Sequence, residues 1–562
     1  MGLTDTASWR TAGDDEELRK STLKRSNARL GSWSVLVLRI PAREPSEPLR
    51  VIQPKFQVLG GPAPMRDIQR LKTGISALDN ILHGGLIPER LYLVDGNPGS
   101  GKTTLALQFL LEGARRGEKC LYVTLSETRQ ELEAGAASHD WTLDPIDVVE
   151  LIADQQHELS GEGAVTMIQP SDVELSETMG KVLEAIERSS PARLVLDSLS
   201  EMRLLAQSSL RYRRQILALK QFFVGRKCTV LMLDDRTAEG PDLQLHSIAH
   251  GVMALHVTTP VYGQARRQLQ VLKFRGSDFS SGFHDFAIRR GGLALFPRLV
   301  AAEHGSQFTP SVIKSGIVSL DALLGGGIEG GTSTLLVGPP GSGKSTLALQ
   351  YACAATLRGD HAASFIFDET RAALLSRSQG IGLNIREGAG PGEIALKQID
   401  PVEISPGEFA AMVRKCVEQD GARVVVIDSL NGYLNAMPQD NFLVAQLHEL
   451  LSYLSNQGVT TLMVVAQSGM LGSSMSSPVD ASYLADSIVM LRYFEHGGKV
   501  KKALSVMKKR TGGHEGSIRE LWFDKDGVHL SEPILGLRGV LTGVPVELGG
   551  EADKGAMRPP RA

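Results

Sequence analysis

Two stretches decide the fold of this chain: Gly-Asn-Pro-Gly-Ser-Gly-Lys-Thr at residues 96–103 and Gly-Pro-Pro-Gly-Ser-Gly-Lys-Ser at residues 338–345. Each fits the pattern G-x-x-x-x-G-K-[ST], a turn between a strand and a helix whose backbone N–H groups cradle phosphates. The flanking residues agree, because short apolar runs lead into both turns and helix-like runs lead out of them. The sequence therefore predicts two nucleotide sites.

The residue types in these loops predict how each one binds a nucleotide. Glycine lets the backbone curl inward, the lysine reaches the β- and γ-phosphates, and the final hydroxyl ligates Mg²⁺. The positive end of the following helix adds to the attraction for phosphate. The residues expected to contact the nucleotide are Gly96, Asn97, Pro98, Gly99, Ser100, Gly101, Lys102, Thr103 and Thr104 in the first loop, and Gly338, Pro339, Pro340, Gly341, Ser342, Gly343, Lys344, Ser345 and Thr346 in the second.

The two loops belong to a duplicated unit. A Gly-Ile-x-x-Leu-Asp stretch precedes both, at residues 74–79 and 316–321, and its offset of 242 residues equals that between Lys102 and Lys344. A constant offset favours duplication over chance convergence. We therefore predict four segments: an irregular or disordered extension at 1–68, a first unit at 69–305, a second unit at 306–546 and a flexible tail at 547–562.

Composition narrows the class of protein. The 562 residues are 42% apolar, and 60 basic against 63 acidic residues give a net charge of −3. We expect no bulk attraction to nucleic acid or to anionic lipid, and no apolar run approaches the ~20 residues that a membrane span needs. The four cysteines form no C-x-x-C pair and no Cys/His cluster with zinc spacing, so we expect buried, reduced thiols. Residues 14–17 are acidic, unlike a secretory signal. The expected location is the cytoplasm.

The pattern within each unit predicts the fold class. Short apolar strands alternate with amphipathic helical stretches, which is typical of a mostly parallel sheet with helices on both faces. We therefore predict an α/β fold of two tandem phosphate-loop domains. Ligands in such folds bind beyond the carboxyl ends of the strands, where both loops are expected.

Carboxylates follow two further strands in each unit. Apolar runs end in Asp197 and Asp428, which we expect to hold Mg²⁺ together with Thr103 and Ser345. Glu127 and Glu369, again 242 residues apart, are predicted to orient the attacking oxygen or accept its proton. The alternative for these glutamates is a solvated charge at the strand end.

The residue before each glutamate differs between the units. Asp368 is a second candidate base in the second unit, whereas Ser126 holds the equivalent position in the first. A neutral hydroxyl cannot act as a carboxylate base. We therefore expect the first unit to hydrolyse nucleotide more slowly, or mainly to bind it.

Each unit ends in a pair of cations with strand spacing. Alternation places Lys273 and Arg275 on one face of a strand, and likewise Lys508 and Arg510. These strands are too distant to reach the loop of their own unit, so we expect the pairs to act on a neighbouring subunit's γ-phosphate. The alternative is an edge strand protected by lysines.

Together these motifs resemble the KaiC family of circadian clock ATPases and autokinases within the RecA-like superfamily, over residues 70–546. The resemblance implies ATP and Mg²⁺ as cofactors and a hexamer of two stacked rings with ATP at the subunit interfaces. It also implies ATP hydrolysis in the first ring, and serine/threonine autophosphorylation in the second. Signalling proteins are candidate partners, and neither a membrane nor a nucleic acid is expected as one.

The resemblance also points to a phosphate acceptor. The family's adjacent Ser-Thr acceptors map onto Ser482 and Tyr483, so only Ser482 keeps a hydroxyl of the expected type. Ser482 could equally be a polar residue at the start of a strand, and the serines at 473, 474, 476 and 477 are alternative acceptors.

Two other functions are compatible with the sequence. A DNA repair or recombination ATPase would share the RecA-like fold, although the near-neutral charge and the lack of an evident basic–aromatic loop count against it. A nucleotide-gated assembly platform with little catalysis is the other, and Ser126 favours that role for the first unit.

Overall fold

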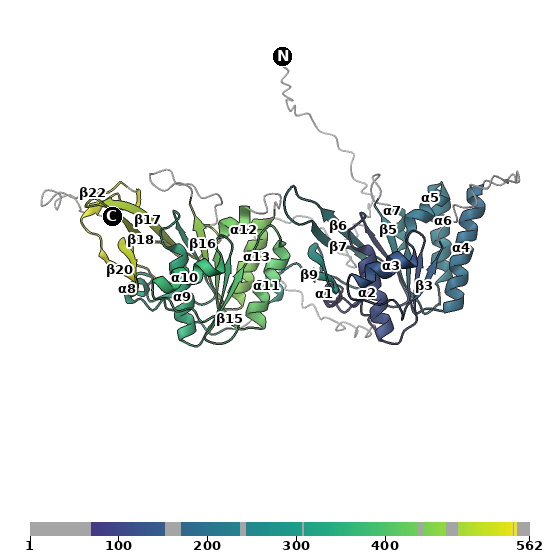
Figure 1. The fold of residues 1–562 in the computed structure, drawn as a ribbon, viewed down its shortest axis with the longest axis horizontal. Coiled ribbons are helices and arrows are strands. Elements are labelled where there is room, and N and C mark those ends of the chain that lie inside the picture. Colours follow the sequence, from purple (N-terminus) through teal and green to yellow (C-terminus); the bar gives the residue numbers. More distant parts are fainter. Residues whose placement is uncertain are drawn as a thin grey trace, which may run out of the picture. The chain divides into compact units, whose positions relative to one another are not determined.

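The computed structural model describes residues 69–151, 170–236, 243–305, 308–435, 442–467, 482–542 and 544–547. The predicted extension at 1–68 and residues 548–562 of the predicted tail lie outside these ranges, as do the four alternative serines at 473–477. Within the described residues the chain forms two nine-stranded sheets of the same topology, each with its own helices (Figure 1). The predicted α/β fold is confirmed.

The first sheet has the strand order β3-β2-β4-β5-β1-β6-β7-β8-β9. The pairings from β3 to β6 are parallel, and those from β6 to β9 are antiparallel. The strands are β1 (Leu91–Gly96), β2 (Cys120–Thr124), β3 (Asp147–Glu150), β4 (Arg193–Asp197), β5 (Thr229–Asp235), β6 (Gly251–Thr258), β7 (Arg266–Phe274), β8 (Phe283–Arg289) and β9 (Gly292–Phe296).

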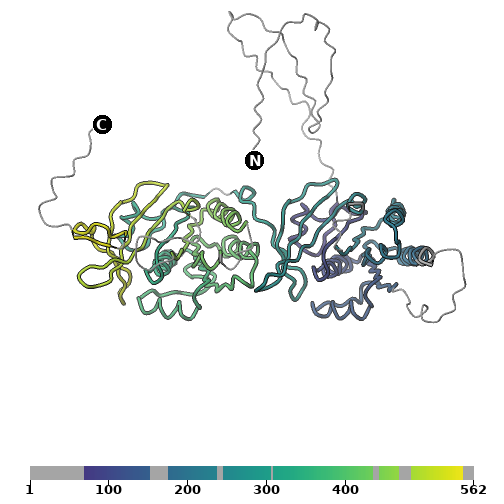
Figure 2. The backbone as a smooth tube through the Cα atoms, turned by 90° about the horizontal axis from the view of Figure 1, so that it is seen from above, coloured from purple at the N-terminus to yellow at the C-terminus, as the bar shows by residue number. Residues whose placement is uncertain are grey.

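Helices cover both faces of this first sheet (Figure 2). Because side chains alternate along a strand, Tyr92 and Val94 of β1 join one core with α1–α3, and Leu91 and Leu93 join another with α4–α7. The helices are α1 (Ser76–Ile81), α2 (Lys102–Arg115), α3 (Arg129–Ala137), α4 (Pro170–Ser189), α5 (Leu199–Ala206), α6 (Ser209–Phe222) and α7 (Leu243–Ile248). A 3₁₀ turn, η1 (Ala301–Glu303), follows β9.

The second sheet repeats this order as β14-β13-β15-β16-β12-β17-β18-β19-β20. Its strands are β12 (Ser333–Gly338), β13 (His361–Ile366), β14 (Ile394–Gln398), β15 (Ala422–Asp428), β16 (Thr460–Ala466), β17 (Ser487–His496), β18 (Lys499–Lys509), β19 (Arg519–Asp524) and β20 (Gly527–Pro533). Its helices are α8 (Val318–Leu323), α9 (Lys344–Leu357), α10 (Arg371–Gly380), α11 (Pro406–Glu418), α12 (Leu430–Asn435) and α13 (Leu443–Asn456). Small ribbons β10 (Val312–Ile313) with β11 (Ile328–Glu329), and β21 (Leu537–Arg538) with β22 (Val546–Glu547), and the 3₁₀ turn η2 (Val540–Thr542) complete the fold.

The duplication extends to individual hydrogen bonds. The Thr73 amide donates to the buried Asp79 carboxylate at 2.9 Å, and the Ser315 amide donates to Asp321 at 2.7 Å. The Thr73 hydroxyl also donates to Asp79 Oδ1, and the Ser315 hydroxyl to Asp321 Oδ1. The lead-in sequence thus forms the same buried turn before each phosphate loop.

Two strand ends and one domain boundary bear on the sequence expectations. Arg275 and Arg510 were expected on a strand face with their lysines, but β7 ends at Phe274 and β18 ends at Lys509, so each arginine begins the turn that follows. Leu299 and Ala301 pack in the core of the second unit, ahead of the predicted boundary at 305/306, which stays a prediction.

Candidate nucleotide sites

Each phosphate loop joins the end of a central strand to the start of a long helix. The first runs from Gly96, the last residue of β1, to Lys102, the first of α2; the second runs from Gly338 to Lys344. No side chain in the described residues caps the N-terminus of either helix. Their first N–H groups therefore remain available to an anion, as phosphate binding at a helix N-terminus requires.

Glycine is required at the helix N-cap of both loops. Gly101 and Gly343 have φ angles of +98° and +105°, which side-chain-bearing residues rarely adopt. A Cβ atom at Gly343 would lie 2.3 Å from Cζ of Phe523, and one at Gly101 would lie 2.9 Å from Cδ1 of Ile288. Tertiary packing and backbone conformation therefore both select glycine here, and the resulting curl fits a phosphate group.

The two loop lysines are buried but differ in their partners. Lys102 Nζ donates to the carbonyls of Gly96 at 3.0 Å and Asn97 at 3.2 Å, and forms an ion pair of 2.6 Å with Asp235. Lys344 Nζ donates to the Pro339 carbonyl at 2.8 Å. Burial lowers the pKa of Lys344 to about 8, although the nearby Asp428 charge acts in the opposite direction.

The predicted metal residues lie side by side in both units. Thr103 Oγ1 donates to Asp197 Oδ2 at 3.3 Å, and Tyr122 donates a short hydrogen bond to the same oxygen. In the second unit, the Ser345 side chain lies close enough to Asp428, at the end of β15, to act against the rise of that carboxyl's pKa. Burial raises the pKa of both aspartates. One carboxylate with a loop hydroxyl, completed by phosphate oxygens and water, fits Mg²⁺, which seldom takes an all-protein shell.

Glu127 lies in the turn after β2, close to this metal position. The Glu127 amide donates to Thr124 Oγ1 at 2.9 Å, and Thr124 Oγ1 donates to the Glu127 carbonyl at 2.7 Å, which fixes the turn. Burial, followed by the charge of Asp197, raises the pKa of Glu127. A carboxylate with a raised pKa is a better proton acceptor, as a base near a γ-phosphate should be.

The equivalent carboxylates of the second unit are held differently. Arg377 of α10 binds Glu369 through two bonds, Nε–Oε1 at 3.2 Å and Nη2–Oε2 at 2.9 Å, and also donates to Thr346 Oγ1 at 2.9 Å. Asp368 accepts a short hydrogen bond from Ser429. The residue 242 positions before Arg377 is Gly135, so the equivalent position of the first unit carries no arginine.

The four predicted cationic fingers hydrogen-bond to the segments just before β6 and β17. Lys273 binds the Ala249 carbonyl at 2.6 Å and Arg275 binds that of Ser247 at 3.2 Å. Lys508 binds the carbonyls of Ser482 at 2.9 Å and Ala485 at 2.8 Å, and Arg510 pairs with Asp486 at 3.2 Å. None of these hydrogen bonds and ion pairs joins a cation to a phosphate loop of the same chain.

Ser482, the candidate phosphate acceptor, is exposed in the turn before β17. Its carbonyl accepts the Lys508 bond described above. The turn therefore places the candidate acceptor and one candidate finger side by side.

Three site residues lie outside the sequence predictions: Tyr122, Asp235 and Arg377. Asp235 had a detectable signal, because β5 is an apolar run ending in two aspartates, like the run that ends in Asp197. Tyr122 and Arg377 had none, because a tyrosine in a buried strand and an arginine on a helix occur in many structural contexts.

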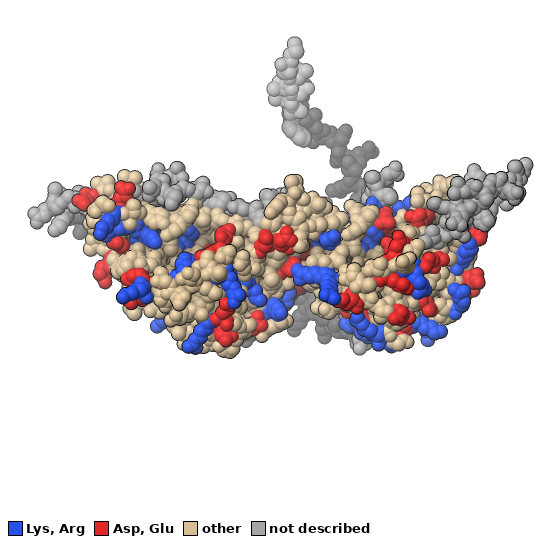
Figure 3. All heavy atoms as spheres, viewed as in Figure 1, with Lys and Arg blue, Asp and Glu red and all other residues tan. Residues whose placement is uncertain are grey.

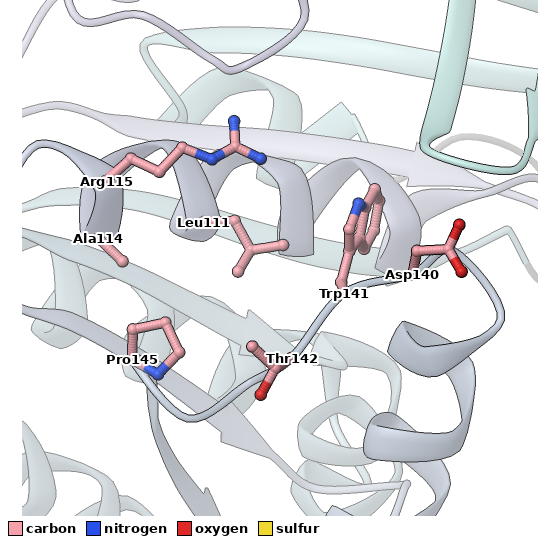
Figure 4. A pocket seen from close by; sticks show the side chains of 7 residues that line it. All are labelled: Leu111, Ala114, Arg115, Asp140, Trp141, Thr142 and Pro145. Atoms are coloured by element: carbon pink, nitrogen blue, oxygen red, sulfur yellow. The ribbon is translucent and has the colours of Figure 1, made fainter.

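A separate pocket of about 380 Å³ lies away from the first loop (Figure 4). Leu111, Ala114 and Arg115 of α2 line one side of it, and Asp140–Thr142 and Pro145 line the other. Leu111 follows Lys102 by nine residues, or about 13 Å along a helix that rises 1.5 Å per residue. The pocket therefore lies toward the C-terminal end of α2, at the opposite end of the helix from the phosphate loop.

Comparisons with known proteins agree with the geometry. The family model described as the KaiC ATPase matches residues 71–300 and 313–533. The circadian clock protein KaiC3 of Synechocystis sp. is 25% identical over 492 residues, covering 85% of this chain and 95% of that protein. The circadian clock oscillator proteins KaiC of Picosynechococcus sp. and Synechococcus elongatus are 26% and 25% identical, each covering 86% of this chain and 94% and 92% of their own lengths.

None of the helices in the described residues is both long enough and apolar enough to span a bilayer. All four cysteines are buried and none forms a disulfide.

Proposed function

Because this chain belongs to the KaiC family of ATPases, we propose that it binds ATP with Mg²⁺ at both phosphate loops and hydrolyses it. The observation that carries this proposal is the repeated juxtaposition of a buried loop lysine, a loop hydroxyl and a strand-end aspartate: Lys102 with Thr103 and Asp197, and Lys344 with Ser345 and Asp428. When bound, Mg²⁺ neutralises charge on the β- and γ-phosphate oxygens.

The side chains around each loop have distinct proposed roles. The loop N–H groups and the lysine bind the phosphates. Thr103 with Asp197, and Ser345 with Asp428, would hold Mg²⁺, the aspartates directly or through water. Glu127 and Glu369 orient the attacking water and accept its proton, with Asp368 as a second candidate in the second unit. The raised pKa of Glu127 supports this role, and the bidentate bond to Arg377 fixes the orientation of Glu369.

We further propose that the second unit transfers phosphate to Ser482, and that the protein works as a hexamer in the cytoplasm, where signalling proteins are its candidate partners. The exposure of Ser482 supports its proposed role as the phosphate acceptor. The proposed hexamer is supported by the position of the four candidate fingers, Lys273, Arg275, Lys508 and Arg510. Cations that do not bind their own loop are available to the loop of an adjoining subunit.

A DNA-repair function is not favoured. On the face seen in Figure 3, Lys and Arg side chains are interspersed with Asp and Glu rather than gathered in one cationic surface, and the net charge of the chain is −3. Neutralising a phosphate backbone requires the opposite arrangement. Nor do the KaiC relatives favour an assembly platform with little catalysis.

The test uses the full chain with Lys102→Ala, Lys344→Ala and both changes together. We expect each single variant to lose ATP binding at one loop and the double variant to lose binding and hydrolysis altogether. Phosphopeptide mapping after incubation with ATP and Mg²⁺ should find phosphate on Ser482 in the Lys102→Ala chain but not in the Lys344→Ala chain. Full hydrolysis by the double variant would refute the proposal.

A further inference from the structure

An acidic residue lies against the lysine of the first phosphate loop, and the second loop lacks its counterpart. Asp235 is the last residue of β5, and the sheet register pairs it with Gly96, the first residue of the phosphate loop. Its Oδ1 forms the 2.6 Å ion pair with Lys102, and its Oδ2 accepts a hydrogen bond of 3.2 Å from Ser200 Oγ. These two contacts hold the Asp235 carboxylate against Lys102, the lysine proposed to bind phosphate.

The second unit has a neutral substitute at the same place. Its register pairs Gly338 with Ala466, so Ala466 is the counterpart of Asp235. The counterpart of Ser200 is Asn431, whose side chain holds the end of the strand. Asn431 Nδ2 donates to the Ala466 carbonyl at 2.9 Å, and the Ala466 amide donates to Asn431 Oδ1 at 2.7 Å. The strand end is thus anchored in both units, but only the first places a carboxylate on the loop lysine.

The charges around the two lysines differ accordingly. Asp197, Glu127 and Asp235 are close enough for their charges to influence one another, and Lys102 is the cation that offsets them. In the second site the charge of Asp428 acts on Lys344, and Asp428 is also within reach of the charges of Arg377, Asp368 and Glu369. A triphosphate entering the first site must therefore share or displace the bond from Lys102 to Asp235, and then remains near the released negative charge.

We propose that Asp235 is a built-in counter-ion of Lys102 that competes with the nucleotide phosphates and makes the first site bind ATP more weakly than its loop sequence alone would allow. The inference rests on the proposed function, because it concerns affinity at a site proposed to bind ATP. Asp235 acts here as a positioning residue: it controls the availability of Lys102 and takes no part in the reaction.

The expected change in ATP affinity depends on how far the Lys102–Asp235 ion pair is exposed to solvent. The Lys102 side chain is 8% exposed, whereas that of Asp235 is 32% exposed, so solvent weakens the interaction without abolishing it. We expect removal of the negative charge to tighten ATP binding at the first site by about tenfold, which corresponds to about 1.4 kcal/mol. Salt should reduce this difference, because it screens a partly exposed charge.

The experiment measures binding of a fluorescent ATP analogue with Mg²⁺ to the full chain carrying Lys344→Ala, so that only the first site binds. Asp235→Asn keeps the shape of the side chain and removes its charge, and Asp235→Ala reproduces the residue of the second unit. Asp144→Asn, an exposed carboxylate in the segment after α3, is the control for a simple change in net charge. The reciprocal change, Ala466→Asp in the Lys102→Ala chain, should weaken the second site by a similar factor.

The outcomes separate the two proposals. Tighter binding by Asp235→Asn, but not by Asp144→Asn, supports the counter-ion. Unchanged or weaker binding by Asp235→Asn, when the Lys344→Ala parent binds the analogue, overturns it and leaves the proposed function intact. If neither the parent nor Asp235→Asn binds although the unmodified chain does, the inference also fails. No binding by the unmodified chain refutes the proposed function itself.

Discussion

Lys344 illustrates how burial adjusts a residue proposed to bind phosphate. The side chain lies under its own loop with the Pro339 carbonyl as a hydrogen-bond acceptor, and burial lowers its pKa to about 8. An ammonium group is charged below its pKa and neutral above it. Its attraction for phosphate should therefore be complete at neutral pH and decline as the pH rises through this value.

We predict that ATP affinity at the second site falls by up to tenfold for each pH unit above about 8. The measurement is a titration of the Lys102→Ala chain with a fluorescent ATP analogue between about pH 7 and pH 9.5. Lys344→Arg in the same chain is the matched control, because a guanidinium stays charged over this range and its affinity should stay nearly constant. An equally flat profile for Lys344 itself would contradict the prediction.

A second prediction at this scale concerns Glu369. Glu369→Gln keeps the size of the side chain but removes its ability to accept a proton. Turnover at the second site should fall by about 10²–10⁴-fold, the usual contribution of a general base, while ATP affinity changes little. Steady-state kinetics and binding in the Lys102→Ala chain would show this. Glu387→Gln, which removes a carboxylate paired with Arg371, the first residue of α10, serves as the control and should keep normal turnover.

At the scale of elements, the junction of β12, the loop and α9 is a tightly constrained segment of the second unit. Gly343 combines a φ of +105° with a Cβ position only 2.3 Å from the Phe523 ring on β19. Any side chain there must both strain the backbone and displace the ring. The loop shape therefore depends on the antiparallel strand that the fold brings against it.

We predict that Gly343→Ala lowers the free energy of unfolding of the second unit by about 2–5 kcal/mol, from backbone strain plus overpacking, and abolishes ATP binding there. Gly380→Ala is the control: it is the last residue of α10, it has open space around its Cβ position, and it should leave stability unchanged or slightly raised. Denaturant unfolding of both variants is the measurement. Equal stability of the two would show that the ring moves aside without cost.

At the scale of the whole molecule, the cationic fingers decide whether the sites are complete within one subunit. Arg510 begins the turn after β18 and pairs with Asp486, so it must leave this partner to reach a phosphate. If it acts on an adjoining subunit, each second site combines Glu369 from one chain with Arg510 from another.

This arrangement predicts complementation between inactive variants. Glu369→Gln and Arg510→Ala chains should each have low second-site turnover, but mixing them and allowing subunits to exchange should restore part of it, because some interfaces then contain both native residues. Native mass measured with ATP should show an assembly of about six chains. No recovery on mixing, or full turnover by a monomer, would exclude a finger supplied by a neighbour.

Local sequence was enough to predict both phosphate loops, the duplication and the α/β fold, because a strand, a glycine-rich turn and a helix are encoded by contiguous residues such as 91–115. Asp197 and Asp428 could also be located as predicted metal residues, since each ends an apolar strand. Only the tertiary structure shows the pairing of Lys102 with Asp235 and of Arg377 with Glu369 and Thr346. The first pair is 133 residues apart along the chain and depends on sheet register, and the second depends on the rotation of α10; neither leaves a local periodic signal.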